Sequence, residues 1–388
     1  MKKGPLNNIV VLDLTRAVSG PYCTMMLYNL GATIIKIEHP GNGDDTRGLG
    51  PFIEKISSYN AIFNYGKKSI ALDLKNEADR KIFEELLPKV DVLVENFRPG
   101  FMEKFGYGWE ALHKKYPQLI YAAISGYGQT GPIATHACYD LVAQGICGIM
   151  MLTGHSENEP TKVGTEIADV LSGIFTAFGI NTALFHRERT GEGSLVDVAM
   201  LDCMLSLLYS AVDRYTATHE IPHAIGNRHP IAAPFDTFYA KDRPLNIAVA
   251  NDNLFRKLCG VLKRPELADD ERFATIPART KNRVALTNIM AEILKTKNAT
   301  EWLEDLVKAG IPAGRIYTLK ETLDFPQLIH RKMVHRFKGD YMPTIRFPGN
   351  PLKLSCLEDL TENEKAPALD ENRQEILNFI KTGKWLRE

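Results

Sequence analysis

Short apolar runs alternate with helical patterns over the first 125 residues of the chain. Residues 9–14 form a continuous apolar run of strand length, residues 22–30 have the pattern of a helix, and residues 33–37 form a second, β-branched strand. A strand, a helix and a strand in this order make a βαβ unit, whose crossover joins parallel strands in a sheet buried on both faces. The alternation therefore predicts a Rossmann-like, doubly wound parallel α/β sheet in a large domain.

The same alternation continues to residue 125 and returns after residue 190. Further strands are expected at residues 69–72, 90–95, 119–125 and 194–199, with helices at 77–87, 109–115 and 201–215. In such a sheet the ligand site lies beyond the carboxyl ends of the strands. The loops at residues 16–21, 39–47, 96–106 and 126–140 are therefore the places where a site is expected.

A change of composition near residue 219 predicts a second, smaller α/β domain. Residues 219–234 are rich in Pro, His and Gly with little periodicity, which is typical of a linker. Beyond it we expect a strand at residues 245–250, helices at 253–262, 282–294 and 299–309, and a turn in GIPAG (310–314). Strand and turn signals return near residue 337, and a helix is expected at 372–382.

The charge balance and the cysteine pattern limit the class of function. The chain has 47 basic and 47 acidic side chains, so no basic surface for nucleic acid or an anionic membrane is expected. The six cysteines form no CxxC pair and mostly lie in apolar stretches, as reduced thiols of a cytoplasmic protein would. No export signal and no uninterrupted apolar run of roughly eighteen residues is present. Small-molecule chemistry in the cytoplasm is therefore expected.

One carboxylate stands at the start of a long apolar helix pattern. From Val170 to Phe185 apolar residues recur at three- and four-residue steps, which predicts a buried helix with Asp169 in its first turn. The simplest role for Asp169 is capping, because free N–H groups and the positive end of the helix dipole stabilise an anion. The alternative role is that of a nucleophile.

Two motifs of other enzyme classes lack the surroundings that they need, and a third is absent. GYGQTG (126–131) has the spacing of a dinucleotide fingerprint, but Pro132 follows where a helix should begin. His219, Glu220 and His223 approach the spacing of a zinc motif, but Pro222 breaks the helix that such a motif needs, and no other group suggests a metal. No GxSxG motif follows a strand, so the nucleophile elbow that serine chemistry requires is absent.

The loop ENFRPGFMEKFG (95–106) suits a nucleotide better. Arg98 and Lys104 could meet phosphates while Phe97 covers a base, although a solvated surface loop would have a similar composition. Positive charge from the neighbouring strand region would add to the site: Lys67, Lys68 and Lys75.

Several segments together resemble the class III CoA-transferases, the family of formyl-CoA transferase and the CoA-transferase of carnitine metabolism. In order they are VLDLTRAVSGPYCTMMLYNLGATIIKIEHPGNGDDTRG (11–48), YGKKSIALDLK (65–75), DVLVENFRPG (91–100), SGYGQTGP (125–132) and YDLVAQ (139–144), extended by GNRHP (226–230) and GIPAG. The resemblance implies acyl-CoA and a carboxylic acid as substrates, no tightly bound cofactor, and an interlocked homodimer. It also implies that residues 1–218 and 330–388 form the large domain, with residues 235–329 inserted as the small one.

The family's nucleophile is an aspartate at the start of a helix, and it matches Asp169 in IADVLSG. The resemblance implies that this carboxylate attacks the acyl-CoA thioester to form an anhydride. CoA thiolate then returns to give an aspartyl-CoA thioester, and an acceptor acid completes the exchange. Covalent steps of this kind keep the thioester energy from being lost to water. The helix start supplies a reason for Asp169 to remain ionised, so capping and nucleophilic roles are compatible.

The other site residues are carried over from the same motifs. Those expected to bind CoA are Val18, Ser19, His39, Leu72, Lys75, Asn96, Phe97, Arg98, Lys104 and Phe105, and those expected to border the acyl group are Val18, Tyr139 and Asp140. His39 and Lys104 stand where relatives often have arginine, and Asp140 replaces a glutamate of formyl-CoA transferases. The GNRHP segment replaces the glycine-run loop of oxalate-using members, which argues against oxalate and formyl-CoA as the natural pair.

Two alternatives remain open from the sequence. An α-methylacyl-CoA racemase, or another isomerase of the same fold, would move a proton at the α-carbon without exchanging acids. Racemases carry histidine where this chain has Tyr139, which argues against that function. A catalytically silent CoA-binding protein is the second alternative, and the complete motif around Asp169 argues against it.

Overall fold

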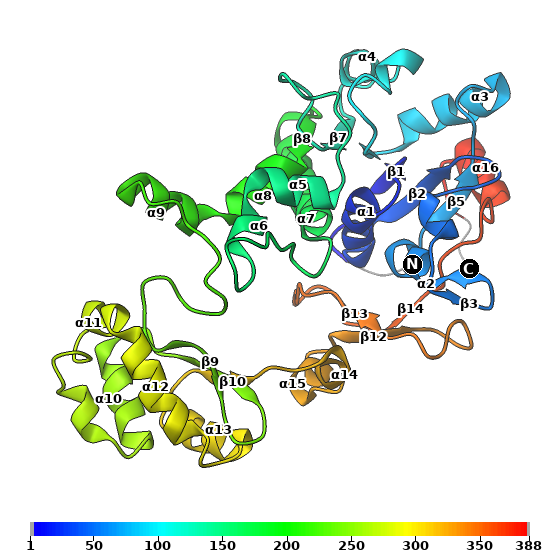
Figure 1. Ribbon diagram of the computed structural model, residues 1–388. Helices are drawn as coiled ribbons and strands as arrows, with labels where there is room; N and C mark the ends of the chain where they lie inside the picture. The colour runs from blue at the N-terminus through cyan, green and yellow to red at the C-terminus, as the bar shows by residue number, and fades with distance from the viewer. Residues whose placement is uncertain (1–3, 386–388) are drawn as a thin grey trace. The chain divides into compact units, whose positions relative to one another are not determined.

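A six-stranded parallel sheet forms the centre of the large part of the computed structural model, which describes residues 4–385 (Figure 1). Its strands are β1 (Val10–Asp13), β2 (Thr33–Glu38), β5 (Lys68–Ala71), β6 (Val92–Glu95), β7 (Ile120–Ser125) and β8 (Leu195–Ala199). They lie in the order β5-β2-β1-β6-β7-β8, and every neighbouring pair is parallel. The strand order reverses between β1 and β6, as in doubly wound folds. The α/β class and the parallel sheet that the alternation predicted are confirmed.

Both faces of the sheet are covered because its strands are apolar on both sides. On one face, Leu12 and Leu93 pack with Phe83 of helix α3 (Glu77–Leu86) and Ile376 of α16 (Arg373–Thr382). The opposite face carries Val11 and Ile34 against α1 (Ser19–Asn29) and α7 (Ile167–Thr190). Figure 1 shows α3 and α16 together at one side of the sheet. This two-sided burial is what continuous apolar strands of a parallel sheet require.

Shorter elements complete this part of the chain. They are η1 (Asp45–Gly48), β3 (Phe52–Ile53), β4 (Ile56–Ser57), α2 (Ser58–Asn64), η2 (Leu87–Lys89), η3 (Glu103–Phe105), α4 (Trp109–Lys115), α5 (Asp140–Cys147), α6 (Ile149–Leu152), α8 (Met200–Leu207), α9 (Tyr209–Thr218), α15 (Pro326–His330), β12 (Val334–Phe337), β13 (Phe347–Pro348) and β14 (Glu362–Asn363). The single helix predicted over residues 201–215 is wrong, because α8 ends at Leu207 and α9 begins at Tyr209. No Pro or Gly marks that break in the sequence.

The chain divides into two compact units. The first holds residues up to Met150, Lys162–Ile221 and the residues from Phe325 on, and the second holds Met151–Thr161 and Pro222–Asp324. The place of Met151–Thr161 in the second unit was not anticipated from the sequence.

The second unit has an antiparallel sheet in the order β11-β10-β9. Its elements are β9 (Phe235–Tyr239), β10 (Pro244–Ala248), α10 (Asp252–Val261), η4 (Pro265–Ala268), α11 (Ile276–Lys281), α12 (Arg283–Leu294), α13 (Ala299–Lys308), β11 (Ala313–Arg315) and α14 (Leu319–Leu323). Strand β9 was missed, and the turn predicted in GIPAG is partly wrong, because Ala313 and Gly314 pair with β10.

Helix α7, with 24 residues, is within the described residues the one helix long and apolar enough to cross a membrane by length and composition, and an 18-residue window of it has a mean hydropathy of 1.5. No such span was expected from the sequence. A core helix passes the same test, and α7 buries Gly173, Ala177 and Ile180 on its inner side.

Candidate active site

Two loops meet where the strand order reverses, between β1 and β6. The side chain of Asn96, which follows β6, joins them: its Oδ1 accepts from the Arg16 N–H at 2.9 Å, and its Nδ2 donates to the Arg16 carbonyl at 2.8 Å and to Ser19 Oγ at 3.2 Å. Val18 and Ser19 are each only 5% exposed beside it. The structure therefore brings three of the predicted CoA-binding residues together at the crevice where doubly wound folds bind ligands.

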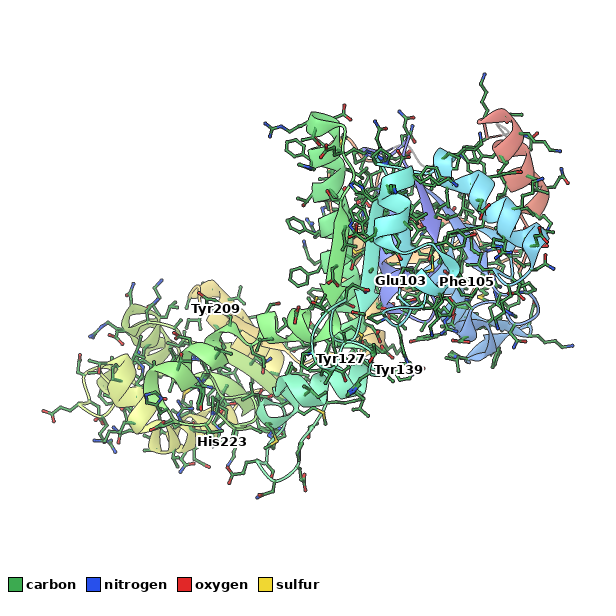
Figure 2. The ribbon with its side chains drawn as sticks, turned by 90° about the horizontal axis from the view of Figure 1, so that it is seen from above. Glu103, Phe105, Tyr127, Tyr139, Tyr209 and His223 are labelled. Carbon is green, nitrogen blue, oxygen red and sulfur yellow. The ribbon has the colours of Figure 1, made fainter. Side chains whose placement is uncertain are left out.

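Aromatic rings continue this group along the loop after β6. Phe97 stacks on Phe101 with ring centroids 4.3 Å apart, and Phe105 in η3 lies 5.4 Å from Phe101. Figure 2 shows Glu103 and Phe105 next to each other. The ring of Phe97 is therefore already occupied on one side by Phe101, while Arg98 and Lys104 are exposed and accessible to phosphates.

The loop after β5 brings the next predicted residues to the neighbouring strand end. Leu72 is buried at 3% exposure, whereas Lys75 and His39 are exposed. A groove of about 880 Å³ connects this loop with η3, lined by Asn76, Glu77, Ala78, Arg80, Lys81, Glu84, Phe105 and Tyr107. Its lining includes Asn76 and Phe105, the residues that directly follow Lys75 and Lys104 in the chain.

Lys67 is not available to a ligand, and the expectation that it adds charge to a phosphate site is wrong. Its Nζ pairs with Asp13 at 3.0 Å and donates to Thr24 Oγ1 and Asn64 Oδ1, and the Lys67 and Asp13 side chains are fully buried. Burial lowers the pKa of Lys67 to about 8 against the opposing effect of Asp13. Lys67 therefore belongs to the interior beneath the site.

Asp169 lies in the first turn of α7, as predicted, but it does not cap the helix. The N-cap residue is Glu166, and within residues 4–385 the Asp169 carboxylate receives no hydrogen bond. Instead Asp140, at the start of α5, accepts from the Ala168 N–H at 2.8 Å, and its other oxygen accepts from Gln144 at 2.7 Å. The capping role predicted for Asp169 therefore falls to Asp140, and the Asp169 carboxylate is left without a structural partner.

The pKa of Asp169 is raised to about 7, first by burial and then by the negative charges of Asp140 and Glu166. The helix start therefore does not keep the pKa of Asp169 low, because burial and the two like charges raise it. A carboxylate with this pKa is more basic than an ordinary aspartate and is partly ionised at neutral pH. Such perturbation is typical of catalytic groups, although ion clusters can also produce it.

A glycine allows the helix that carries Asp169 to approach the first loop. A Cβ on Gly173, one turn along α7, would lie 2.7 Å from the Ser19 carbonyl oxygen. Only glycine fits this contact without a shift of the backbone. The close packing of α1 on α7 thus brings the Asp169 helix next to the Val18 and Ser19 loop.

Tyr59 is a candidate that the motifs missed. Burial raises the pKa of this phenol to about 12, and the negative charges of Glu166, Asp169 and Asp140 add to the effect, so Tyr59 lies within electrostatic range of the same carboxylates. Tyr59 lies in α2, between the two matching segments at 11–48 and 65–75, where no motif pointed to it. Tyr139, by contrast, is 77% exposed.

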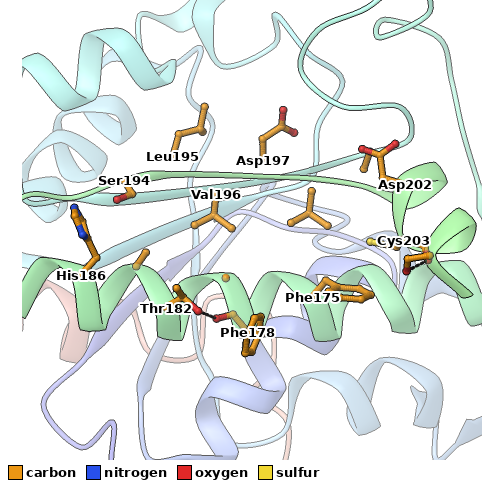
Figure 3. A pocket seen from close by; sticks show the side chains of 15 residues that line it. Phe175, Phe178, Thr182, His186, Ser194, Leu195, Val196, Asp197, Asp202 and Cys203 are labelled. Atoms are coloured by element: carbon orange, nitrogen blue, oxygen red, sulfur yellow. Dashed lines mark hydrogen bonds between the residues drawn. The ribbon is translucent and has the colours of Figure 1, made fainter. Parts of the chain in front are cut away.

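A separate pocket of about 750 Å³ lies between α7 and β8 (Figure 3). Its lining includes Phe175, Phe178 and Val196, and it contains none of the site residues predicted from the sequence. Within residues 4–385, no group of three or more His, Cys, Asp or Glu side chains could hold a metal ion.

Comparison with known proteins identifies the family. The model of CoA-transferase family III matches residues 6–373. The chain is 46% identical over 370 residues to the acetyl-CoA:oxalate CoA-transferase of Acetobacter aceti, covering 95% of this chain and 94% of that one. It is 34% identical to the succinyl-CoA:glutarate CoA-transferase of Homo sapiens, covering 97% and 86%. A solved CAIB/BAIF family protein from Brucella suis has 38% identity and a TM-score of 0.85, covering 98% of this chain and 100% of that one.

The chain therefore belongs to CoA-transferase family III. It is an enzyme that moves CoA between an acyl-CoA thioester and a carboxylic acid. The transferase function inferred from the sequence is confirmed at this level.

Proposed function

We propose that Asp169 carries the transfer as a nucleophile. Its carboxylate attacks the thioester carbonyl carbon of the donor, the carbon–sulfur bond breaks, and CoA thiolate leaves an aspartyl-acyl anhydride. The thiolate then attacks the aspartyl carbonyl, which releases the donor acid and forms an aspartyl-CoA thioester. The acceptor carboxylate attacks this thioester to form a second anhydride, and the thiolate takes the acceptor acyl group and frees Asp169. The observation that carries this proposal is a half-buried carboxylate with no structural partner and a raised pKa in the first turn of α7.

We also propose the roles of the surrounding residues. The loops that bind CoA carry Val18, Ser19, His39, Leu72, Lys75, Asn96, Phe97, Arg98, Lys104 and Phe105, and the acyl group is bordered by Val18, Tyr139 and Asp140. The meeting of the loops after β1 and β6 supports this arrangement. Asp140 contributes by holding the start of α7 through the Ala168 N–H.

The substrates that we propose are short dicarboxylic acids and their CoA thioesters. Similar enzymes are named for oxalate, mesaconate and glutarate, with acetyl-CoA or succinyl-CoA as donor. Oxalate is kept among the proposed acids because a relative is named for it, although the GNRHP segment argues against oxalate. The test is a panel of acyl-CoAs with isotope-labelled mono- and dicarboxylic acids, followed by mass spectrometry. Exchange confined to monocarboxylic acids would contradict the proposal, and α-proton exchange without acid exchange would favour the racemase.

The rate of transfer is expected to rise with pH through about 7, because the ionised form of Asp169 attacks and is lost as pH falls below its pKa. Glu166→Gln removes one of the negative charges that raise this pKa, so the midpoint of the pH profile should move to lower pH. Glu110→Gln, an exposed change on α4, is the matched control and should leave the midpoint in place. Initial rates across the pH range measure both. A profile that is the same in all three proteins would contradict this assignment of the midpoint to Asp169.

A Rossmann-like fold, an interlocked homodimer and a cytoplasmic location are further parts of this proposal. The dimer is supported by large apolar side chains on the outer faces of three helices: Phe178 and Phe185 on α7, Leu205 on α8 and Tyr209 on α9 are 71, 65, 55 and 84% exposed. Exposed apolar surface of this extent is typical of an interaction site. The cysteines are unpaired in the structure, as a reducing compartment allows.

Phe178→Glu is expected to weaken the dimer, raising its dissociation constant by about tenfold or more, because a charge would be buried without a partner. Val284→Glu, at a 66% exposed position of α12, is the control that should have no such effect. Light scattering after gel filtration measures the molecular mass over a range of concentrations. A parent protein that is monomeric throughout would contradict the proposed assembly.

A further inference from the structure

We propose that Asn96, Lys36 and Asp44 form a clamp that holds residues 15–19, the loop between β1 and α1, in position for acyl-CoA. Their side chains act as positioning groups, and the amide of Asn96 in particular serves the loop and not the ligand. This inference rests on the proposed placing of acyl-CoA at Val18 and Ser19.

Both ends of the Asn96 amide are occupied by the loop. Its oxygen accepts from the Arg16 N–H and its nitrogen donates to the Arg16 carbonyl, at 2.9 and 2.8 Å, so that the two peptide units on either side of the Arg16 Cα are both held. The second N–H of the amide reaches Ser19 Oγ at 3.2 Å. An amide with two donors has none left for CoA once both are used in this way.

A buried ion pair holds the loop from the other side. Lys36 Nζ, in the middle of β2, donates to the Thr15 carbonyl at 2.8 Å and pairs with Asp44 Oδ2 at 2.9 Å. The other oxygen of Asp44 accepts from the Ala17 N–H at 3.1 Å. Both charged side chains are fully buried, and burial of an ion pair is costly unless its remaining hydrogen-bonding capacity is used. Here part of that capacity is directed at Thr15 and Ala17, and Asp44 Oδ1 also accepts from the N–H and the hydroxyl of Thr46 at 3.0 and 2.8 Å.

The clamp holds the loop in a backbone conformation that it would not adopt by itself. Ala17 has a φ of 63°, in the left-handed region that alanine rarely occupies. Such a residue persists where its surroundings fix it on several sides, and such sites often have functional roles. The Ala17 N–H is held by Asp44. Its two neighbours are also held in place: Arg16 is bonded to Asn96, and Val18 is the N-cap residue of α1.

A loop that is ordered before the ligand arrives lowers the entropic cost of binding. If Asn96 acts in this way, its loss should mobilise the loop in the absence of any ligand. A residue that only contacts CoA should not change the free protein. The two roles are therefore distinguished by an observation on the ligand-free enzyme.

The test is hydrogen–deuterium exchange of the full-length, ligand-free protein, with KM for acyl-CoA measured beside it. In Asn96→Ala, the amides of Arg16 and Ala17 should exchange about tenfold faster or more, with exchange of the central strands unchanged. Arg98→Ala, from the same loop, is the matched control: it should raise KM for acyl-CoA without changing exchange in residues 15–19. Asn96→Asp keeps an acceptor for the Arg16 N–H but loses both donors, so its exchange should be intermediate.

Exchange in Asn96→Ala equal to that of the parent would overturn the clamp and would leave the proposed function standing. The reverse result, an unchanged KM in Arg98→Ala with fast loop exchange in Asn96→Ala, would support the clamp and contradict the placing of CoA. If Asn96→Ala did not fold, the Asn96→Asp protein would decide the question by the same measurement, and parent-like exchange there together with a raised KM would overturn the clamp.

Discussion

Asp169→Asn is expected to lower the rate of CoA transfer by at least about 10³-fold, while the protein stays folded. Asparagine has the shape of aspartate, but its amide cannot attack a thioester or leave again as a carboxylate. Because the Asp169 carboxylate receives no hydrogen bond within the described residues, the substitution removes no structural contact there. Initial rates of exchange between a donor acyl-CoA and a labelled acid measure the effect.

Asp202→Asn is the matched control for this substitution, because Asp202 also lies in the first turn of a helix, α8, and is exposed. Its rate should remain close to that of the parent. An Asp169→Asn protein that transfers CoA as fast as Asp202→Asn would exclude the covalent mechanism.

The second large effect concerns stability and is expected at Lys67. Lys67→Met should lower the free energy of unfolding by about 3–5 kcal/mol, because it leaves the fully buried Asp13 carboxylate without its opposite charge. Lys68→Met, at the next residue, removes a half-buried pair with Glu375 and should cost about 1 kcal/mol or less.

Urea denaturation of the two variants and the parent makes the comparison. In the double variant Asp13→Asn with Lys67→Met, part of the lost stability should return, because neither charge is then buried alone. Equal costs for Lys67→Met and Lys68→Met would show that the buried pair does not hold the strand ends together.

The parallel sheet and the position of Asp169 could be predicted because both depend on local pattern. Apolar runs of strand length separated by helical patterns are sufficient to indicate βαβ units, and the three- and four-residue steps after Asp169 located α7 to within a few residues. The break between α8 and α9 could not be predicted, because Leu208 and its neighbours are good helix formers and the break is set by packing.

The environment of Asp169 could not be predicted, because it depends on residues distant in the sequence. Asp140 lies 29 positions before Asp169, and only the folded chain shows that it caps α7 and raises the pKa of the nucleophile candidate. The position of Asp169 at a helix start suggested a lowered pKa, because the effect of the helix dipole can be assessed from the sequence, whereas burial cannot.

The partners of the buried charged residues beneath the site could not be predicted from the sequence either. Lys67 resembles any surface lysine in its sequence context, yet it is buried against Asp13. Lys36 did carry a signal, since a lysine between Ile35 and Ile37 in a strand buried on both faces must find a partner inside. The direction of its contacts toward the loop after β1 required the structure.

The central claim is that Asp169 becomes covalently attached to CoA, and trapping this intermediate tests it most directly. The enzyme is incubated with an acyl-CoA donor, treated with hydroxylamine, digested and analysed by mass spectrometry. Hydroxylamine converts an aspartyl thioester to a hydroxamate and releases CoA, so the peptide that contains Asp169 should carry the hydroxamate only when donor was present. An enzyme that exchanges CoA at its full rate, while Asp169 stays unmodified and another residue is trapped, would contradict the account.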